Sequence, residues 1–439
     1  MSYYKALESY DIRESSNLSF WDNFPKDRGE DGPLTTTPAG QSVDPVALDF
    51  IEASQASGIP LASLGFNDLN ETKRLGAGFY EFNIKDGTRD SVASAFLSGN
   101  IPNNLEIRRG STAQKVLFDP SSQTNAIGVQ YASSLDGMLK EVFLRQDSPG
   151  TRQSEIILSG GAIMTPQILA SSGIREGGDI VDLSGVGKNL QDHPAVAISF
   201  PIEKPLLSEV LNYEDSNFKN YLNFLTEEKN PIEEGRQEEK DVPKHSGLYG
   251  TAGFSAGAFL KSPWSLKTPD IQLTVFPKRV EPHFADSGKA PSEQDEILVT
   301  VALLNADGRY ELKFDSSEFK NDPNIPLIQR LIVPKIVPIG GGYLTERDVD
   351  RLVWGLEEVR RIQKSNPLRK NTKEELYPGA GIKGQELRDF IKENVMTNAH
   401  WCGTTRMGNK NDDKAVVDQN LRVKGVNKLR VVDAGVSIS

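Results

Sequence analysis

The segment that decides the fold reads Asn398-Ala-His-Trp-Cys-Gly-Thr-Thr-Arg-Met-Gly408, and it is followed by Leu429-Arg-Val-Val-Asp-Ala434. His400 stands just before a glycine-flanked turn, and the later stretch is typical of a short apolar strand. A neutral imidazole can accept a hydroxyl proton while the neighbouring C–H leaves as hydride, so His400 is a candidate base. The two glycines would let the backbone approach a bulky planar ligand closely. A half-buried histidine with satisfied hydrogen bonds is the plainer interpretation, and it stays open at this point.

Composition and charge narrow the function classes. The 439 residues include 50 Lys+Arg and 61 Asp+Glu, a net charge of −11, and an acidic surface argues against nucleic acid as the main partner. No apolar run approaches the roughly 20 residues that span a bilayer, and the first residues lack the layout of a secretory signal. Cys402 is the one cysteine, and there are four histidines, which argues against a disulfide or a metal cluster. We expect no metal, no membrane partner and, by default, a cytoplasmic location.

The hydrophobic pattern predicts the main elements. Helices are expected at residues 45–56, 91–98, 165–172 with Pro166 at the first position, and after Thr345, which can cap with Asp348. Short strands are expected at residues 105–108, 115–118, 126–131, 139–144, 155–158 and 271–276. Residues 297–304 and 309–314 are predicted to form a hairpin through Asp307-Gly308, since Asp-Gly favours a tight turn. Residues 227–244 are predicted to form a loop, and residues 1–45 a surface segment with little core.

Further motifs follow one another in a recognisable order. They are Gly87-Thr-Arg-Asp-Ser91, Asn104-Leu-Glu-Ile-Arg-Arg-Gly110, Gly161-Ala-Ile-Met-Thr-Pro-Gln-Ile-Leu-Ala-Ser-Ser-Gly-Ile174 and Gly185-Val-Gly-Lys-Asn-Leu-Gln-Asp-His-Pro194. Together with the segment around His400, they resemble the glucose–methanol–choline (GMC) flavin oxidoreductases. The resemblance covers nearly all of the chain and is thinnest at residues 10–45 and 200–340.

The resemblance implies an activity and a set of site residues. The activity is the FAD-dependent oxidation of a small-molecule alcohol, with His400 as base and flavin N5 as hydride acceptor. Asp433 and Ala434 would approach the flavin through backbone groups, and the backbone of Ala113 would contact the adenine. His193 would have a structural role, with Asn189 and Asp192 satisfying local backbone groups.

The same resemblance implies an α/β fold of two regions. We expect an incomplete FAD-binding, Rossmann-like domain beside an antiparallel-sheet α+β substrate domain. Residues 1–85 would be a lid or linker with a substrate-domain segment, 86–198 part of the FAD-binding domain, 199–395 the substrate domain, and 396–439 the C-terminal part of the FAD-binding domain.

Two parts of the family pattern are missing from the sequence. A flavin dinucleotide is normally held by a strand, a Gly-x-Gly-x-x-Gly turn and a helix N-terminus, and we expect no such fingerprint anywhere in this chain. The family's second active-site histidine or asparagine, beyond Ala434, is also missing. Without its first strands a parallel sheet would expose edge backbone and tend to aggregate unless covered. A truncated or inactive homologue unable to hold FAD, and a redox-neutral cyclase or lyase, therefore remain alternative functions.

Overall fold

The computed structural model describes residues 2–11, 28–38, 45–62, 65–67, 74–85, 87–99, 101–145, 153–202, 252–266, 268–277, 296–314, 335–339 and 343–437. The predicted loop at 227–244 lies outside these residues. The chain divides into two compact units. Unit 1 comprises Met1–Asn103, Pro194–Leu304 and Val349–Met396, and unit 2 comprises Asn104–His193, Asn305–Asp348 and Thr397–Ser439. The predicted domain boundaries stay predictions, because a compact unit is not by itself a functional domain. The units differ from them chiefly in grouping residues 305–348 with the C-terminal segment.

A six-stranded sheet forms the centre of unit 1. Its strand order is β19-β13-β16-β15-β14-β3, which span Met396–Thr397, Pro194–Pro201, Glu296–Leu303, Ile271–Phe276, Ala256–Leu260 and Gly76–Phe79. The pairs from β13 to β3 are all antiparallel, and Leu273 lies opposite Val301. Every residue of β13 is buried. This sheet has the antiparallel character that the sequence predicted for the second region.

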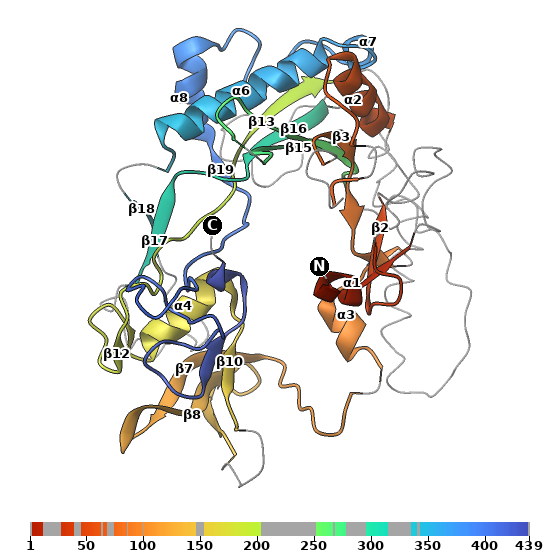
Figure 1. The fold of residues 1–439 in the computed structure, drawn as a ribbon. Helices are drawn as coiled ribbons and strands as arrows, with labels where there is room; N and C mark the ends of the chain where they lie inside the picture. The colour runs from red at the N-terminus through yellow and green to blue at the C-terminus, as the bar shows by residue number, and fades with distance from the viewer. Residues whose placement is uncertain are drawn as a thin grey trace. The chain divides into compact units, whose positions relative to one another are not determined.

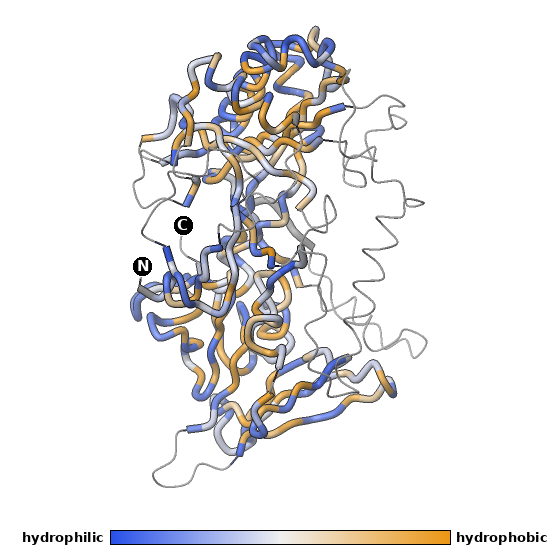
Figure 2. The backbone as a smooth tube through the Cα atoms, turned by 90° about the vertical axis from the view of Figure 1, so that its right-hand side faces the viewer, coloured by the Kyte–Doolittle hydropathy of each residue, from blue (hydrophilic) through white to orange (hydrophobic). Residues whose placement is uncertain are grey.

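Helices cover one face of this sheet. In Figure 1, α2 (Pro45–Ala56), α6 (Glu346–Gln363) and α7 (Leu368–Asn371) lie over the same face, and α8 (Gly384–Asn394) lies beside α6. Figure 2 shows hydrophilic and hydrophobic stretches alternating along the coiled helices at the top of the molecule. The predicted bounds of α2 are confirmed, and α6 presents the predicted apolar face, which comprises Leu352, Leu356, Val359 and Ile362, all buried.

Local hydrogen bonds begin α6 as the sequence predicted. The Asp348 N–H donates to Thr345 Oγ1 at 3.1 Å, and the Thr345 N–H donates to Asp348 Oδ2 at 3.0 Å. This reciprocal arrangement satisfies donors that a helix N-terminus otherwise leaves unpaired. The short helix α3 (Val92–Leu97) begins in the same way, with Ser91 and Ser94 forming a capping box.

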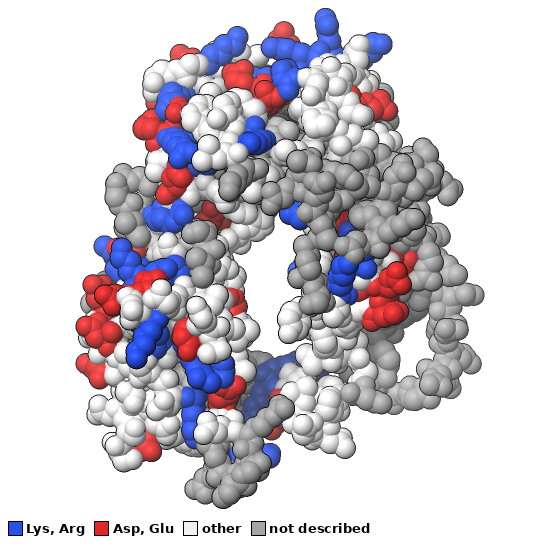
Figure 3. Space-filling model, viewed as in Figure 1, with Lys and Arg blue, Asp and Glu red and all other residues white. Residues whose placement is uncertain are grey.

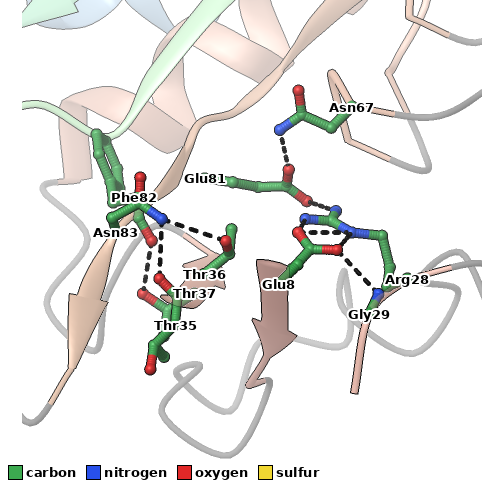
Figure 4. Close-up of polar contacts among 10 residues, drawn as sticks. All are labelled: Glu8, Arg28, Gly29, Thr35, Thr36, Thr37, Asn67, Glu81, Phe82 and Asn83. Carbon is green, nitrogen blue, oxygen red and sulfur yellow. Dashed lines mark hydrogen bonds and ion pairs between the residues drawn. The ribbon is translucent and has the colours of Figure 1, made fainter. Parts of the chain in front are cut away.

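The N-terminal residues hold a buried ionic cluster. After α1 (Ser2–Leu7), strand β1 (Glu8–Tyr10) pairs in parallel with β2 (Leu34–Pro38), which pairs antiparallel with β4 (Glu81–Phe82). Arg28 lies between two carboxylates, with its Nη1 2.6 Å from Glu81 Oε1 and its Nε 3.0 Å from Glu8 Oε2 (Figure 4). All three side chains are nearly inaccessible to solvent. The expected surface segment is therefore partly buried, although most of the buried side chains before Val46 that the structure describes are polar or charged. A small hairpin, β5 (Ile84–Lys85) and β6 (Thr88–Arg89), follows.

The described part of unit 2 contains one three-stranded sheet, several two-stranded pairs and helix α4. Strands β7 (Ser111–Asp119), β8 (Ser122–Ser133) and β9 (Leu139–Phe143) form an antiparallel sheet, and β10 (Ile156–Leu158) pairs in parallel with β20 (Leu429–Val431). Helix α4 (Gly161–Ser171) follows β10 and precedes the short pair β11 (Ile174–Arg175) and β12 (Val181–Asp182). An apolar core, which includes Leu158, Leu169 and Val431, joins β7, β8, β10, β20 and α4. Figure 1 shows the C-terminal segment beside α4.

Two strand predictions are wrong. Residues 105–108 form no strand, and Leu105 and Ile107 are exposed. Strand β17 (Arg309–Lys313) pairs with β18 (Lys335–Ile339), not with β16 as the predicted hairpin required. The Asp307 and Gly308 N–H groups donate to the Asp348 carboxylate at 2.9 and 3.0 Å. A tertiary partner thus overrides the turn that Asp-Gly favours locally.

The literal spacing Gly-x-Gly-x-x-Gly does occur, at Gly379-Ala-Gly-Ile-Lys-Gly384, which the sequence-based expectation overlooked. It lies in turns that lead into α8, whose first residue is Gly384, and it does not follow a strand of a parallel sheet. The Gly379 N–H donates to Glu375 Oε1 at 3.2 Å, and the Ile382 carbonyl accepts from Arg360. The carboxylate at this turn would repel a phosphate. The expected absence of a strand–glycine turn–helix combination therefore holds for this stretch.

Charged side chains of both signs are interspersed over the described residues on the face drawn in Figure 3. Within the described part of the chain, no helix combines the length and apolar character needed to cross a bilayer.

Candidate active site

Three segments that are far apart in the sequence meet in unit 2. Gln191 and Cys402 exchange backbone hydrogen bonds at 3.0 and 3.1 Å, and the Gly187 N–H donates to the Thr404 carbonyl at 2.9 Å. The Gly403 N–H donates to the Ala434 carbonyl at 3.2 Å. The motif that ends in His193, the turn after His400 and the segment after Asp433 are therefore one hydrogen-bonded structure. The sequence presents them as separate motifs.

Helix α4 contacts the turn that follows His400. The helix begins earlier in the sequence than predicted. It begins at Gly161, four residues before the predicted start, so Pro166 lies inside the helix. Proline has no N–H and cannot donate to the carbonyl of Ala162, four residues earlier. The buried hydroxyl of Thr404 donates to that carbonyl at 2.6 Å. A side chain of the His400 turn thus replaces the helix hydrogen bond that Pro166 removes.

Asp433 joins the C-terminal segment to the start of α4. Its Oδ2 accepts from the Gly161 N–H at 2.9 Å and from Thr165 Oγ1 at 2.6 Å. Its Oδ1 accepts from the Gly435 N–H at 2.8 Å, which begins the 3₁₀ helix η8 (Ala434–Val436). A carboxylate at a helix N-terminus is favoured by the unpaired N–H groups and the helix dipole. The side chain of Asp433 therefore binds the protein itself.

The backbone of His400 is held by a buried carboxylate. The His400 N–H donates to Asp192 Oδ1 at 2.9 Å, and the other oxygen of Asp192 accepts from the Thr397 hydroxyl. Ala399 has a φ of +56°, a conformation that costs an alanine about 1 kcal/mol. Asn189, in the same left-handed region, donates from Nδ2 to the Gly403 carbonyl at 3.3 Å. Asn189 and Asp192 were expected to satisfy local backbone groups, but the groups they bind here belong to the distant residues Gly403 and His400.

The imidazole of His400 contacts a second histidine that sequence reasoning did not connect with it. The Nδ1 atoms of His400 and His193 are 2.9 Å apart, and the ring planes are nearly perpendicular. His400 is exposed and His193 is half-buried. The sequence assigned His193 only a structural role. The antiparallel contact of Gln191 with Cys402, which aligns the two histidines, cannot be read from either motif alone.

The thiol of Cys402 and the phenol of Tyr343, near this site, stay uncharged. Burial raises the pKa of the Cys402 thiol, so no reactive thiolate is favoured here. Burial, reinforced by the charge of Asp192, raises the pKa of Tyr343 to about 12. Among the described residues, no group of three or more His, Cys, Asp or Glu side chains could hold a metal ion.

Gly403 and Gly408 were expected to let the backbone approach a ligand, but their surroundings in the structure indicate another reason for glycine. A Cβ at Gly403 would lie 2.7 Å from the Asn189 carbonyl oxygen, and one at Gly408 would lie 2.6 Å from Ala415 Cβ. Both glycines therefore allow close packing of protein on protein, not the approach of a ligand. Gly161 is different. Its φ is +82°, and an added Cβ would meet open space.

These residues fit one part of a flavin dinucleotide and not another. The open side of Gly161, the backbone around Ala434 and the exposed imidazole are suited to a planar ring with polar edges. The N-terminus of α4 is a poor phosphate site, because the Asp433 carboxylate already occupies the Gly161 N–H and would repel an anion. The diphosphate would need donors other than these.

Ala113 lies elsewhere in unit 2. It is half-buried on β7, opposite Tyr131 of β8. Strand β7 has β8 as its one neighbour in the described three-stranded sheet, so its other edge is not paired with a strand there, although the Val116 N–H donates to Ser172 Oγ at 2.8 Å. Ala113 is thus not among the residues gathered around His400, and its assignment to an adenine contact remains a prediction.

Comparison with known proteins identifies relatives over nearly the whole chain. Two models of the GMC oxidoreductase family match residues 1–195 and 339–439, which together are more than half of the chain. Human mitochondrial choline dehydrogenase is 30% identical over 420 residues, covering 93% of this chain and 62% of that protein. The acceptor-linked alcohol dehydrogenase of Pseudomonas putida is 27% identical over 421 residues, covering 93% and 66%. The chain thus spans about three fifths of the length of the choline dehydrogenase.

Solved structures show the same fold. Pyridoxine 4-oxidase from Mesorbium loti matches with a TM-score of 0.71 and 23% identity, over 99% of this chain and 71% of that one. Aspergillus oryzae RIB40 formate oxidase, in a structure concerned with FAD modification, matches with a TM-score of 0.74 and 20% identity, over 99% and 72%. The fold class expected from the sequence is confirmed, and FAD is the cofactor that this family and its structural relatives indicate.

Proposed function

The chain belongs to the GMC oxidoreductase family, and we propose that it carries the proton-accepting side of an active site that oxidises a small-molecule alcohol with FAD. The observation that carries the proposal is the hydrogen-bonded meeting of three segments at His400. This meeting fixes the backbone of His400 through Asp192 and leaves its imidazole exposed. A fixed backbone with an accessible ring is what a general base needs, because the base must reach its substrate in one geometry.

Each of these residues has a proposed role in proton transfer or in binding FAD. His400 accepts the hydroxyl proton of the alcohol. The backbone around Ala434 and the open side of Gly161 contact the flavin, while Asp433 holds both segments in place. The backbone of Ala113 contacts the adenine at the edge of β7 away from β8. Bound FAD would supply the hydride acceptor.

The substrate is proposed as a class only. The related proteins include a choline dehydrogenase, an alcohol dehydrogenase and a pyridoxine oxidase, which supports a primary alcohol on a small molecule. A panel of choline, pyridoxine and simple aliphatic alcohols would test this class, with an artificial dye and with oxygen as electron acceptors.

The decisive experiment combines a spectrum with turnover. The purified chain, incubated with FAD and freed of excess, should retain a flavin absorbance near one equivalent and oxidise at least one alcohol of the panel. His400→Ala should keep the flavin and lose turnover by at least about 100-fold, the usual contribution of a general base. Cys402→Ala, two residues away on the same segment, is the matched control and should keep both.

The outcomes separate the alternatives. A soluble, colourless chain would favour a homologue that cannot hold FAD. Flavin binding without net oxidation of any alcohol would favour a redox-neutral reaction. Full turnover in the His400→Ala variant would remove His400 as the base.

A further inference from the structure

The contact between His400 and His193 is not explained by the hydrogen bonds that hold the backbone. Asp192 anchors the His400 N–H, and Gln191 pairs with Cys402, so the chain is placed without any help from the His193 ring. These bonds leave the rotation of the His400 imidazole undetermined. The 2.9 Å contact between the two Nδ1 atoms is the shortest described contact that fixes it.

We propose that His193 is a positioning residue that sets the tautomer of His400. The inference rests on the proposed function, in which His400 is the base. Each neutral imidazole has one N–H and one bare nitrogen, so one of two Nδ1 atoms in contact must carry hydrogen and the other must accept it. His400 Nδ1 is engaged in this contact, which leaves Nε2 to face a substrate. Nε2 can accept a proton only when it is bare, so the hydrogen lies on His400 Nδ1 and is donated to His193 Nδ1.

The proton balance of the step follows from this assignment. The alcohol O–H bond breaks and its proton passes to His400 Nε2, while the hydride passes to the flavin of the proposed reaction. His400 becomes a cation with hydrogen on both nitrogens. Its Nδ1–H continues to donate to His193 throughout, so the ring does not turn during the reaction.

The amide of Asn398 is a competitor for the same atom. Its Nδ2 lies 3.4 Å from His400 Nδ1, beyond the usual range of an N–H hydrogen bond. Were Asn398 the true donor, His400 Nδ1 would be bare and Nε2 protonated, and His193 would not set the tautomer. The two possibilities give opposite protonation patterns.

Nitrogen NMR of the full chain with ¹⁵N-labelled histidine distinguishes them. At a slightly alkaline pH, His400 should show a protonated Nδ1 and a bare Nε2, and His193 a bare Nδ1. Single variants His193→Gln, His400→Gln, His245→Gln and His283→Gln assign the four residues. The reverse pattern at His400 in the unaltered protein would overturn the proposal, and this measurement does not depend on any variant folding.

Matched variants separate positioning from a structural role. His193→Phe keeps a ring but removes the acceptor, and should shift His400 towards the Nε2–H form. His193→Gln offers a carbonyl acceptor and should restore the Nδ1–H form. In the loaded enzyme, His193→Phe should lower kcat about tenfold, the loss of one hydrogen bond to the reactive form, with KM changed less than about twofold. The proposal is refuted if the His400 spectrum is the same in the phenylalanine variant.

The spectrum also distinguishes this inference from the proposed function. It needs neither FAD nor substrate. A chain with the expected protonation pattern but no alcohol oxidation would disprove the function and keep the histidine contact. A chain that oxidises alcohols but shows the opposite protonation pattern would keep the proposed function and disprove the role of His193.

Discussion

Replacing Thr404 with valine tests how the turn that follows His400 and helix α4 stabilise each other. The Thr404 hydroxyl is fully buried and donates to the Ala162 carbonyl at 2.6 Å. Valine has nearly the same volume but no donor, so the change leaves a buried carbonyl without its partner. Such a loss costs about 1–3 kcal/mol. We expect the free energy of unfolding to fall by that amount, as measured by urea titration followed by circular dichroism.

The same replacement in a Pro166→Ala background isolates the cause. Alanine restores an N–H at the position that normally donates to the Ala162 carbonyl, so the helix can satisfy it without Thr404. The cost of Thr404→Val should then fall, giving a coupling energy of about 1–2 kcal/mol in the double-mutant cycle.

Thr405→Val is the matched control. The Thr405 hydroxyl is also fully buried, but it has no hydrogen-bond partner among the described residues. Its removal should cost little or stabilise the protein. Equal costs for Thr404→Val with proline and with alanine at position 166 would refute the reasoning, as would equal costs for the two valine variants.

The other predictions concern buried carboxylates. Arg28→Met leaves Glu8 and Glu81 buried without their cation. We expect the free energy of unfolding of unit 1, measured by urea titration, to fall by about 3–5 kcal/mol. A fall of less than about 1 kcal/mol would show that the ionic cluster contributes little to stability. Burial acts to raise the pKa of Glu8, but Arg28 and the Gly29 N–H outweigh it and hold that pKa below 4.5. The resulting stability is present above pH 4.5 and is lost as the pH falls through the lowered pKa, so acid titration should show a steeper loss in the unaltered protein than in Glu8→Gln. Asp433→Asn replaces one carboxylate oxygen by an NH₂ group, which would face the N–H and hydroxyl donors that now bind Asp433. We expect the free energy of unfolding to fall by about 1–3 kcal/mol, measured by thermal unfolding. An unchanged melting temperature would contradict this prediction.

The sequence predicted best where one local signal acts alone. The periodic apolar residues of α2 and α6 and the capping pair Thr345–Asp348 gave correct helices, because each depends on neighbours along the chain. The Asp307-Gly308 hairpin failed because the Asp348 carboxylate takes its N–H groups. Asp348 is too far along the chain to be considered when a turn is predicted from neighbouring residues.

Helix α4 shows the same limit at the candidate site. Proline is favoured at the first position of a helix, and Pro166 was placed there for that reason. The structure begins the helix at Gly161, because Asp433 accepts from the Gly161 N–H and Thr404 compensates for the proline. Both compensating residues belong to the C-terminal segment. The helix could therefore be predicted to exist, but its start could not be predicted without knowing which distant side chains reach it.

The two carboxylates of the site accept hydrogen bonds from backbone N–H groups. This explains why the family motifs can be recognised in the sequence although their arrangement in space cannot be predicted from it. Asp192 binds the His400 N–H, and Asp433 binds the Gly161 N–H. Each joins a motif to a segment far along the chain, so neither residue type is dictated by its own neighbours. Removing either carboxylate should displace His400 or α4 without touching the imidazole. The sequence thus offers His400 as a candidate base, whereas its placement is specified by contacts that become visible only in the folded unit.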